Sequence, residues 1–351
     1  MEKIDIKSLD LEELTNLIIE LGEKKFRSKQ IYEWIHVRLV ESFDEMTNIS
    51  VAFREKLKET CYLTVHKPVE ILTSKIDGTQ KYLFMLSDGS VIESVLMKYH
   101  HGNSVCISTQ VGCRMGCRFC ASTLDGLERN LKPSEMLDEI YRIQKLTGER
   151  VSNIVLMGTG EPMDNFDNVI KFLKLISDEN GLHISQRNIT ISTCGIVDGI
   201  RKLADSGVQV TLALSLHASD DETRKSLMPV ANKYTIAQIL EACDYFFQKT
   251  GRRVSFEYSL VAGVNDTEEE AGKLVSLLKG KNCHVNLIPV NPIKERDYRQ
   301  SDKVAIDKFK NKLEKNGINV TIRREMGRDI EGACGQLRKS YTDKYKKEKE
   351  A

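Results

Sequence analysis

Three cysteines stand close together in the segment TQVGCRMGCRFCAST, where Cys113, Cys117 and Cys120 follow the spacing C-x3-C-x2-C. Thiolates this close converge on one inorganic centre only if the backbone curls around it, and Gly112 and Gly116 permit such a curl. A structural zinc site usually has four protein ligands, a catalytic one usually includes His or a carboxylate, and incidental cysteines are normally scattered. A [4Fe–4S] cluster normally takes four thiolates, so three leave one iron open to a substrate or cofactor. The spacing favours a cluster over zinc.

A glycine-rich motif, MGTGEPMDN, occupies residues 157–165. It has the spacing of neither a P-loop nor a dinucleotide fingerprint. Its place after a strand-like run and before a helix-like run makes it informative, because Gly160 and Glu161 then lie where a backbone can approach a ligand closely.

Four polar residues lie at the ends of three further apolar runs of the chain. Ser192 ends NITIST, Ser215 and His217 end VTLALSLH, and Asn291 follows LIPV. Taken singly, such residues are more often caps or turn residues. Together, at equivalent strand ends, they predict the lining of one pocket.

Two more cysteines have settings that suit chemistry. Cys106 lies on a predicted strand just before the cysteine loop, and Cys334 lies between Gly332 and Gly335. A flexible loop that holds an accessible thiol suits a nucleophile or redox residue, while a buried loop cysteine is the alternative. Packed or incidental thiols are the better interpretation for the remaining four, which are Cys61, Cys194, Cys243 and Cys283.

The elements that must position these residues alternate between strands and helices beyond Cys106. Strand candidates are SVCIST, NIVLMG, NITIST, VTLALSLH, VSFEYSLV, HVNLIPV and NVTIRR, and the helices expected between them lie near residues 134–146, 165–176, 236–247, 268–278 and 303–313. Six or seven β–α units predict a parallel sheet, either doubly wound or a full or partial barrel. In either fold, functional groups sit at the carboxyl ends of the strands.

The domain boundaries follow from the change of pattern. We expect an N-terminal helical domain over residues 1–62, a β-rich extension over 63–103, the α/β core with a catalytic loop over 104–338, and a charged tail over 339–351.

The amino-acid composition indicates the broad class of protein. The chain has 351 residues, 40% of them hydrophobic, and its 52 basic and 51 acidic residues leave a net charge of +1. This excludes disordered and fibrous proteins, and no run approaches the 18 or so apolar residues of a membrane span. Nine cysteines, with no apolar segment at the start, lead us to expect a reducing cytoplasm.

The combination of CISTQVGCRMGCRFCAST, MGTGEP, ISTCG, SLHAS, VNLIPVNP and GACGQL resembles one family over nearly the whole chain. That family is the bacterial radical S-adenosylmethionine (SAM) methyltransferases that modify carbon 2 of adenine in 23S rRNA and in tRNA. The resemblance implies an α/β fold, a partial (β/α)6 barrel with an N-terminal helical domain and a β-meander extension. It also implies one [4Fe–4S] cluster on Cys113, Cys117 and Cys120, and two molecules of SAM per turnover.

The resemblance further implies the residues that bind SAM. They match the aromatic residue before the third cysteine, the glycine-rich loop and the polar strand ends: Phe119, Gly160, Glu161, Ser192, Ser215, Leu216, His217 and Asn291. Thr159 between two glycines is a mild departure from the family's GGEP loop.

The chemistry implied by the family explains the two extra cysteines. Carbon 2 of adenine is electrophilic and cannot displace a methyl group from SAM, but a carbon radical can add to it. One SAM methylates Cys334, and a radical made from a second SAM removes hydrogen from that S-methyl group. The carbon then adds to adenine, and Cys106 helps to remove the ring proton and forms a disulfide with Cys334. Glu93 matches a proton acceptor of the family, although by itself it resembles an exposed charge on an alternating strand.

The resemblance also implies binding partners for this protein, and three alternative functions stay open. The family implies rRNA and tRNA substrates, an external electron donor such as flavodoxin or ferredoxin, no membrane and a monomer. Two basic clusters are candidate phosphate contacts: Lys24, Lys25, Arg27 and Lys29, and then Arg323, Arg324 and Arg328. The alternatives are the related carbon-8 adenine methyltransferase of antibiotic resistance, a radical SAM enzyme with a non-RNA substrate, and a zinc-containing RNA-binding module without catalysis.

Overall fold

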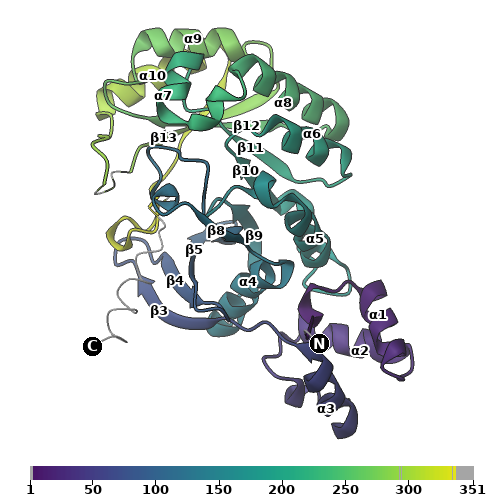
Figure 1. Ribbon diagram of the computed structural model, residues 1–351. Helices are drawn as coiled ribbons and strands as arrows, with labels where there is room; N and C mark the ends of the chain where they lie inside the picture. Colours follow the sequence, from purple (N-terminus) through teal and green to yellow (C-terminus); the bar gives the residue numbers. More distant parts are fainter. Residues whose placement is uncertain (1–2, 292, 294, 334, 337–351) are drawn as a thin grey trace.

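The main feature of the computed structural model is a ten-stranded sheet that curls around the centre of the molecule (Figure 1). The structure describes residues 3–291, 293, 295–333 and 335–336. The strand order is β14-β13-β12-β11-β10-β9-β6-β5-β4-β3. Strands that neighbour one another in the sheet therefore also follow one another along the chain, except that a separate two-stranded hairpin lies between β6 and β9.

The N-terminal segment forms a small unit of three helices to one side of the sheet (Figure 1). A capping box at Asp10 starts the first helix, whose buried Leu14, Leu17 and Ile18 recur at helical spacing. The elements are β1 (Ile4–Asp5), α1 (Leu11–Glu20), α2 (Phe26–His36), α3 (Val51–Thr60) and β2 (Cys61–Tyr62), and β1 pairs with β2.

An antiparallel meander follows, made of β3 (Lys67–Thr73), β4 (Gln80–Met85) and β5 (Val91–Tyr99). It joins the parallel part of the sheet through β6 (Gly102–Cys106), which pairs antiparallel with β5 and parallel with β9.

The rest of the sheet is parallel, and helices connect its strands. The strands after β6 are β9 (Val151–Leu156), β10 (Ile189–Thr193), β11 (Thr211–Ser215), β12 (Val254–Leu260), β13 (Cys283–Pro289) and β14 (Asn319–Ile322). The connecting helices are α4 (Pro133–Thr147), α5 (Phe166–Ser177), α6 (Val197–Asp205), α7 (Asp221–Leu227), α8 (Ile236–Thr250), α9 (Glu268–Leu278) and α10 (Lys303–Lys315). The strands β6 and β9 to β13 with their helices form the predicted partial (β/α)6 barrel, and the predicted fold class is confirmed.

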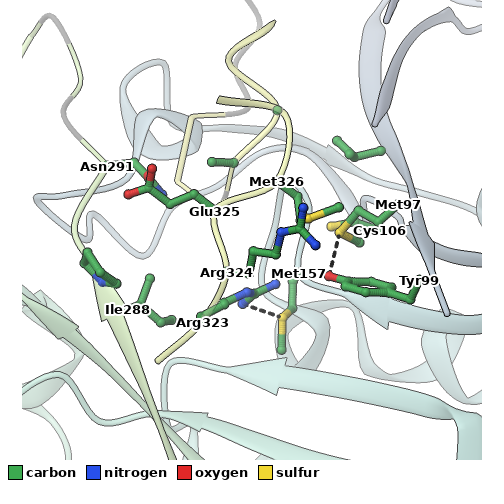
Figure 2. A pocket seen from close by; sticks show the side chains of 14 residues that line it. Met97, Tyr99, Cys106, Met157, Ile288, Asn291, Arg323, Arg324, Glu325 and Met326 are labelled. Atoms are coloured by element: carbon green, nitrogen blue, oxygen red, sulfur yellow. Dashed lines mark hydrogen bonds between the residues drawn. The ribbon is translucent and has the colours of Figure 1, made fainter. Parts of the chain in front are cut away.

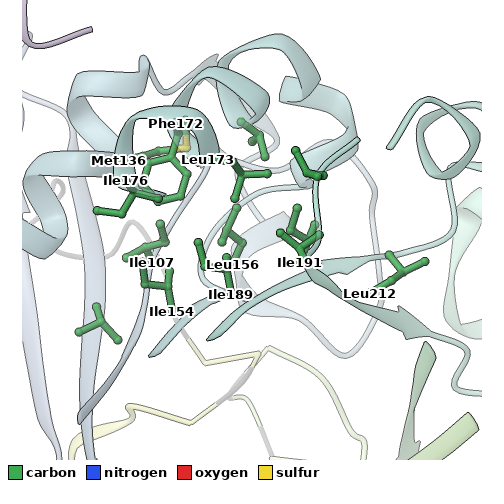
Figure 3. Packing of buried hydrophobic residues seen from close by; sticks show 14 of the residues in the cluster. Ile107, Met136, Ile154, Leu156, Phe172, Leu173, Ile176, Ile189, Ile191 and Leu212 are labelled. Atoms are coloured by element: carbon green, nitrogen blue, oxygen red, sulfur yellow. The ribbon is translucent and has the colours of Figure 1, made fainter. Parts of the chain in front are cut away.

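Packing between strands and helices decides which side chains face the interior of the barrel. Ile189 and Ile191 of β10 belong to the buried cluster that includes Phe172 of α5 (Figure 3). Because successive side chains of a strand point to opposite faces, Ser192 faces away from this cluster. The polar strand ends are therefore directed to the side of the sheet opposite the helices.

The C-terminal segment returns across the mouth of the barrel to the meander. The Asp77 carboxylate accepts a hydrogen bond from the Gly327 N–H at 3.0 Å. The Asp329 carboxylate accepts from the Ser74 hydroxyl at 2.6 Å and from the Lys75 N–H at 2.9 Å. These bonds join the turn between β3 and β4 to the chain beyond β14, so segments from the two ends of the sheet meet.

A buried polar contact joins the N-terminal unit to the barrel. His36 at the end of α2 is fully buried, and its Nδ1 lies 2.8 Å from the Tyr141 hydroxyl of α4. Burial, followed by the charge of Lys7, lowers the pKa of His36 to about 3. The ring is therefore neutral in the folded protein at neutral pH.

This histidine predicts a loss of stability in acid. The pKa of His36 in the folded protein lies below its value of about 6.5 in the unfolded chain. The contribution of the neutral ring to the free energy of unfolding is therefore full above pH 6.5 and is lost as the pH falls toward 3. We expect His36 alone to lower the free energy of unfolding by roughly 2 kcal/mol between pH 6.5 and 5. Urea unfolding, followed by the fluorescence of Trp34 in α2, would measure the loss. A His36→Gln variant with the same pH dependence as the wild type would contradict this prediction.

Candidate active site

A cavity lies at the carboxyl ends of the parallel strands and encloses about 930 Å³, open space at its mouth included. Cys113, Cys117 and Cys120 line it. Every predicted SAM-binding residue except one lines it as well: Phe119, Gly160, Glu161, Ser192, Ser215, His217 and Asn291. The exception is Leu216, which is fully buried and whose N–H donates to the Glu257 carbonyl at 3.0 Å.

A short hairpin, β7 (Gln110–Gly112) and β8 (Leu127–Asn130), holds the ends of the cysteine loop. The Cys113 N–H donates to the Gly126 carbonyl at 2.9 Å. Gly112 has φ +74°, and a Cβ there would lie 2.0 Å from the Gly126 oxygen, so only glycine fits. The hairpin fixes where the loop starts and ends.

The three thiols of the loop are close to one another and largely buried. Burial raises the pKa of Cys113 to about 12 and that of Cys117 well above its ordinary value, and the neighbouring thiols raise both further. These shifts favour the protonated form of Cys113 and Cys117 until a positively charged centre binds and displaces the protons. Within the described part of the chain, no three His, Cys, Asp or Glu side chains converge closely enough for a single metal ion.

The glycine-rich loop packs directly on the strand that leads into the cysteine loop. A Cβ at Gly158 would lie 2.6 Å from the Ile107 carbonyl oxygen, and one at Gly160 would lie 2.7 Å from the Gln110 Cβ. The Glu161 N–H donates to the Gln110 Oε1 at 2.8 Å. The two loops therefore form one continuous wall of the cavity.

Glu161 is a buried carboxylate fixed at the junction of two strand ends. It accepts hydrogen bonds from the Met163 N–H at 3.0 Å and the Cys194 N–H at 2.8 Å. Burial raises its pKa, while these donors act in the opposite direction. A fixed carboxylate here suits the ammonium group of an amino acid.

His217 presents a defined tautomer to the cavity. Its Nδ1 accepts a hydrogen bond from the Ser259 N–H at 2.9 Å, and burial lowers its pKa to about 3. The neutral ring must therefore carry its proton on Nε2, which is a donor. The ring meets that of Phe119 edge to face at a centroid distance of 4.8 Å, so the two aromatic residues form one wall.

His217 gives a direct prediction for cofactor binding. His217→Phe keeps an aromatic ring beside Phe119 but removes the Nε2 donor. We expect SAM to bind about tenfold more weakly, since one hydrogen bond contributes roughly 1 kcal/mol or slightly more. Equilibrium binding of SAM to anaerobic protein would measure the change, with the visible absorbance of the cluster unchanged as control. Wild-type affinity in the variant would remove His217 from the binding site.

The sequence analysis missed two residues that line the cavity and one buried residue beside it. Cys194, interpreted there as a packed or incidental thiol, lines the cavity beside Cys117. Glu257 of β12 is buried and lines the cavity, and its Oε2 accepts no hydrogen bond from the described residues. A glutamate inside the apolar run VSFEYSLV was the available indication. Arg224 is fully buried and donates to the Cys194 carbonyl at 2.6 Å and the Ser215 carbonyl at 3.2 Å, which ties β10 to β11.

A second pocket, around Cys106, adjoins the first (Figure 2). Its walls are rich in methionine and arginine and include Met97, Tyr99, Met157, Arg323, Arg324 and Met326. Four residues line both pockets, namely Met157, Ile288, Asn291 and Arg323. The Arg323 guanidinium lies 3.9 Å from the Glu257 carboxylate and 3.5 Å from the Met157 sulfur. Arg323 therefore stands at the boundary between the two spaces.

Cys334 lies outside the described residues, but its neighbours reach both pockets. Gly332 and Ala333 line the pocket of Cys106. Gly335 lines the cavity of the cysteine loop, and its carbonyl accepts a hydrogen bond from the Ala121 N–H at 2.8 Å. The chain on either side of position 334 thus adjoins the two thiol sites.

Glu93 is not the exposed charge that its alternating strand suggested. It is 4% exposed, and its carboxylate lies 3.5 Å from the ammonium group of Lys81. The surroundings explain the error, because the returning C-terminal segment covers this face of the meander: Lys81 also donates to the Glu331 carbonyl at 3.4 Å. Glu93 lines a small hollow with Ser122, a residue that also lines the main cavity.

Comparisons with known proteins agree with this arrangement. The model of the radical SAM superfamily matches residues 107–275, and the model of the ribosomal RNA large subunit methyltransferase N-terminal domain matches residues 4–63. A probable dual-specificity RNA methyltransferase RlmN of Lachnospira eligens is 67% identical over 339 residues, which cover 97% of each chain. This chain belongs to the RlmN family. A second RlmN relative, from Lachnoclostridium phytofermentans, is 68% identical and covers 98% of this chain and 96% of its own.

A solved structure extends the RlmN comparison to three dimensions. The crystal structure of a radical SAM methyltransferase from Sphaerobacter thermophilus matches with a TM-score of 0.92 and 40% identity. The match covers 96% of this chain and 99% of that one. Membership of the RlmN family confirms the predicted enzyme class, a radical SAM methyltransferase with a [4Fe–4S] cluster and SAM as cofactors. None of the helices within the described residues has the length and apolar character of a bilayer span.

Proposed function

We propose that this protein transfers a methyl group from SAM to carbon 2 of an adenosine in 23S rRNA and in tRNA. The observation that carries the proposal is the junction of two pockets, one lined by three clustered cysteines and the other by Cys106. The described neighbours of Cys334 reach both. A thiol at that junction can meet SAM on one side and a nucleobase on the other.

The cavity residues suit the two cofactors. Cys113, Cys117 and Cys120 would hold the cluster, and the carboxylate of Glu161 and the Nε2 donor of His217 would orient SAM. When bound, the cluster and SAM supply a 5′-deoxyadenosyl radical. The buried donors and acceptors around Glu161 are already satisfied by backbone groups, so the wall is ordered before the ligand arrives.

The chain's own thiols carry out the transfer to RNA. Cys334 accepts the methyl group and presents its carbon to the adenine ring. Cys106, 6% exposed among methionine side chains, would take the ring proton, and the adduct would give up one electron to the cluster. The Cys106 sulfur would then attack the Cys334 sulfur, so that a disulfide forms, the bond from the Cys334 sulfur to the transferred carbon breaks, and that carbon takes up a proton to become the methyl group of the released product. Glu93 lies two residues before Val95 of this pocket, on the same face of β5, and is the candidate acceptor that carries protons away.

RNA reaches this site with its target base unstacked, at a cost of a few kcal/mol. Arg323 and Arg324 line the pocket of Cys106 and Arg328 is exposed on the same segment, so these residues would contact phosphates near the base. The N-terminal unit, whose Lys24, Lys25 and Lys29 are exposed and whose Arg27 is half-buried, would extend the contact. An external one-electron donor, a cytoplasmic setting and a monomer complete the proposal.

The experiment separates the three classes of function. Protein reconstituted anaerobically is incubated with SAM, reductant and either 23S rRNA fragments, tRNA or no RNA, and both 5′-deoxyadenosine and methylated RNA are measured. We expect brown protein that contains iron and sulfide and forms 5′-deoxyadenosine in step with RNA methylation. Release of 5′-deoxyadenosine without methylated RNA would favour a non-RNA substrate, and zinc without iron would favour a binding module.

A further inference from the structure

A second basic surface lies beside the cysteine loop, away from the pocket of Cys106. We call it the arginine surface. It is a hollow formed by the loops after β12 and β13 together with the cysteine loop, and it is lined by Arg118, Val261, Ala262, Val264, Arg296, Asp297, Tyr298 and Arg299. It shares no lining residue with either pocket of the active site.

Three exposed guanidinium groups give the arginine surface its positive charge. Arg118, Arg296 and Arg299 are exposed, and within residues 3–291, 293, 295–333 and 335–336 their guanidinium groups have no carboxylate partner. Among the described residues, Asp297 is the one acidic residue that lines the hollow, so their charges leave the surface net positive. Such a surface attracts an acidic partner.

The surface is also the outer side of the wall that carries the cluster ligands. Arg118 stands between Cys117 and Phe119, and its N–H donates to the Leu227 carbonyl at 2.9 Å. Tyr298 packs against the apolar cluster formed by Cys117, Cys194, Leu227 and Met228. One layer of side chains therefore separates the hollow from a cysteine of the loop.

We propose that the arginine surface receives an acidic electron-donor protein, which reduces the cluster through this wall. The inference rests on the proposed function, because it assigns the docking site for the one-electron donor that the cluster requires. The donor is of the low-potential flavin or iron–sulfur class: it loses one electron, and the cluster gains it. Tyr298 and Val264, which is 37% exposed, add the aromatic and apolar contact typical of a protein interface. RNA is less favoured as the partner of the arginine surface, since its target base must reach Cys106, which lines a different pocket.

The test uses a protein donor and a chemical reductant side by side. The double variant Arg296→Glu/Arg299→Glu leaves the cysteine loop intact, and Lys308→Glu/Lys312→Glu on α10 makes the same change in net charge at another exposed site. The rate of 5′-deoxyadenosine formation by the holoenzyme is measured with RNA present, at low ionic strength, with limiting reduced flavodoxin or with dithionite.

With flavodoxin, we expect the arginine variant to be about tenfold slower or more, and the lysine variant to match the wild type. With dithionite, all three proteins should turn over equally. Equal rates of the arginine variant and the wild type with flavodoxin would overturn the docking site. A loss with both reductants, accompanied by weaker RNA binding, would instead assign the surface to RNA. If the wild type is inactive with dithionite, the proposed function itself fails. This result differs from equal rates with flavodoxin, which would overturn only the docking site.

Discussion

Cys117→Ala is expected to abolish both the cluster and all activity. The Cys117 thiol is buried between the other two cysteines of the loop, so its removal leaves two thiolates and an apolar gap beside them. We expect anaerobically prepared variant protein to lack the brown absorbance and the iron of the wild type, and to form no detectable 5′-deoxyadenosine, a loss of at least about a thousandfold.

Cys61→Ala is the matched control, because Cys61 is also a buried thiol but lies in the N-terminal unit, away from the cysteine loop. It should lower stability by a cavity cost of about 1 kcal/mol and keep the cluster. A Cys117→Ala protein with a full complement of iron would contradict the assignment of the cysteine loop.

Cys334→Ala should separate the cluster from the methyl transfer. The variant keeps every proposed cluster ligand, so it should be brown and bind SAM like the wild type. It has no thiol to carry the methyl group, so we expect no methylated RNA, again at least about a thousandfold below the wild type. Mass spectrometry of digested RNA would measure the product.

Cys106→Ala provides the companion result, since the two cysteines act at different steps. Cys106 lines the pocket next to the residues that flank position 334, where it would resolve the bond between protein and RNA. Its loss should leave RNA covalently attached to the protein, visible as a shifted band on a denaturing gel. The band should be absent from Cys334→Ala and from the double variant. Methylated, released RNA from either single variant would contradict the two-cysteine route.

Local patterns predicted the parts of the site that local sequence determines. The cysteine spacing, the glycine-rich loop and the polar strand ends each follow a run of apolar residues, and in parallel strands these ends meet at one edge. The sequence therefore predicted the lining of the cavity well. Leu216 is the exception. Because successive side chains of an extended chain point to opposite faces, the Leu216 side chain points away from the cavity and is buried.

Long-range contacts account for what the sequence did not reveal. The burial of Glu93 depends on Lys81 and on the chain that returns from β14, and no local pattern shows that chain passing over the meander. The hydrogen bonds of Asp77 and Asp329 that hold this segment join residues about 250 positions apart. Cys194 looked incidental because only the tertiary fold brings the end of β10 to the cysteine loop.

The central claim is that a methyl carbon passes through Cys334 to carbon 2 of adenine. Its most direct test is mass spectrometry of nucleosides from RNA treated with the wild-type protein and SAM whose methyl group is fully deuterated. We expect 2-methyladenosine that carries two deuterium atoms, with the third in 5′-deoxyadenosine, because the radical removes one from the S-methyl group before the carbon is transferred. Modification at carbon 8, or a methyl group that arrives with all three deuterium atoms, would contradict it.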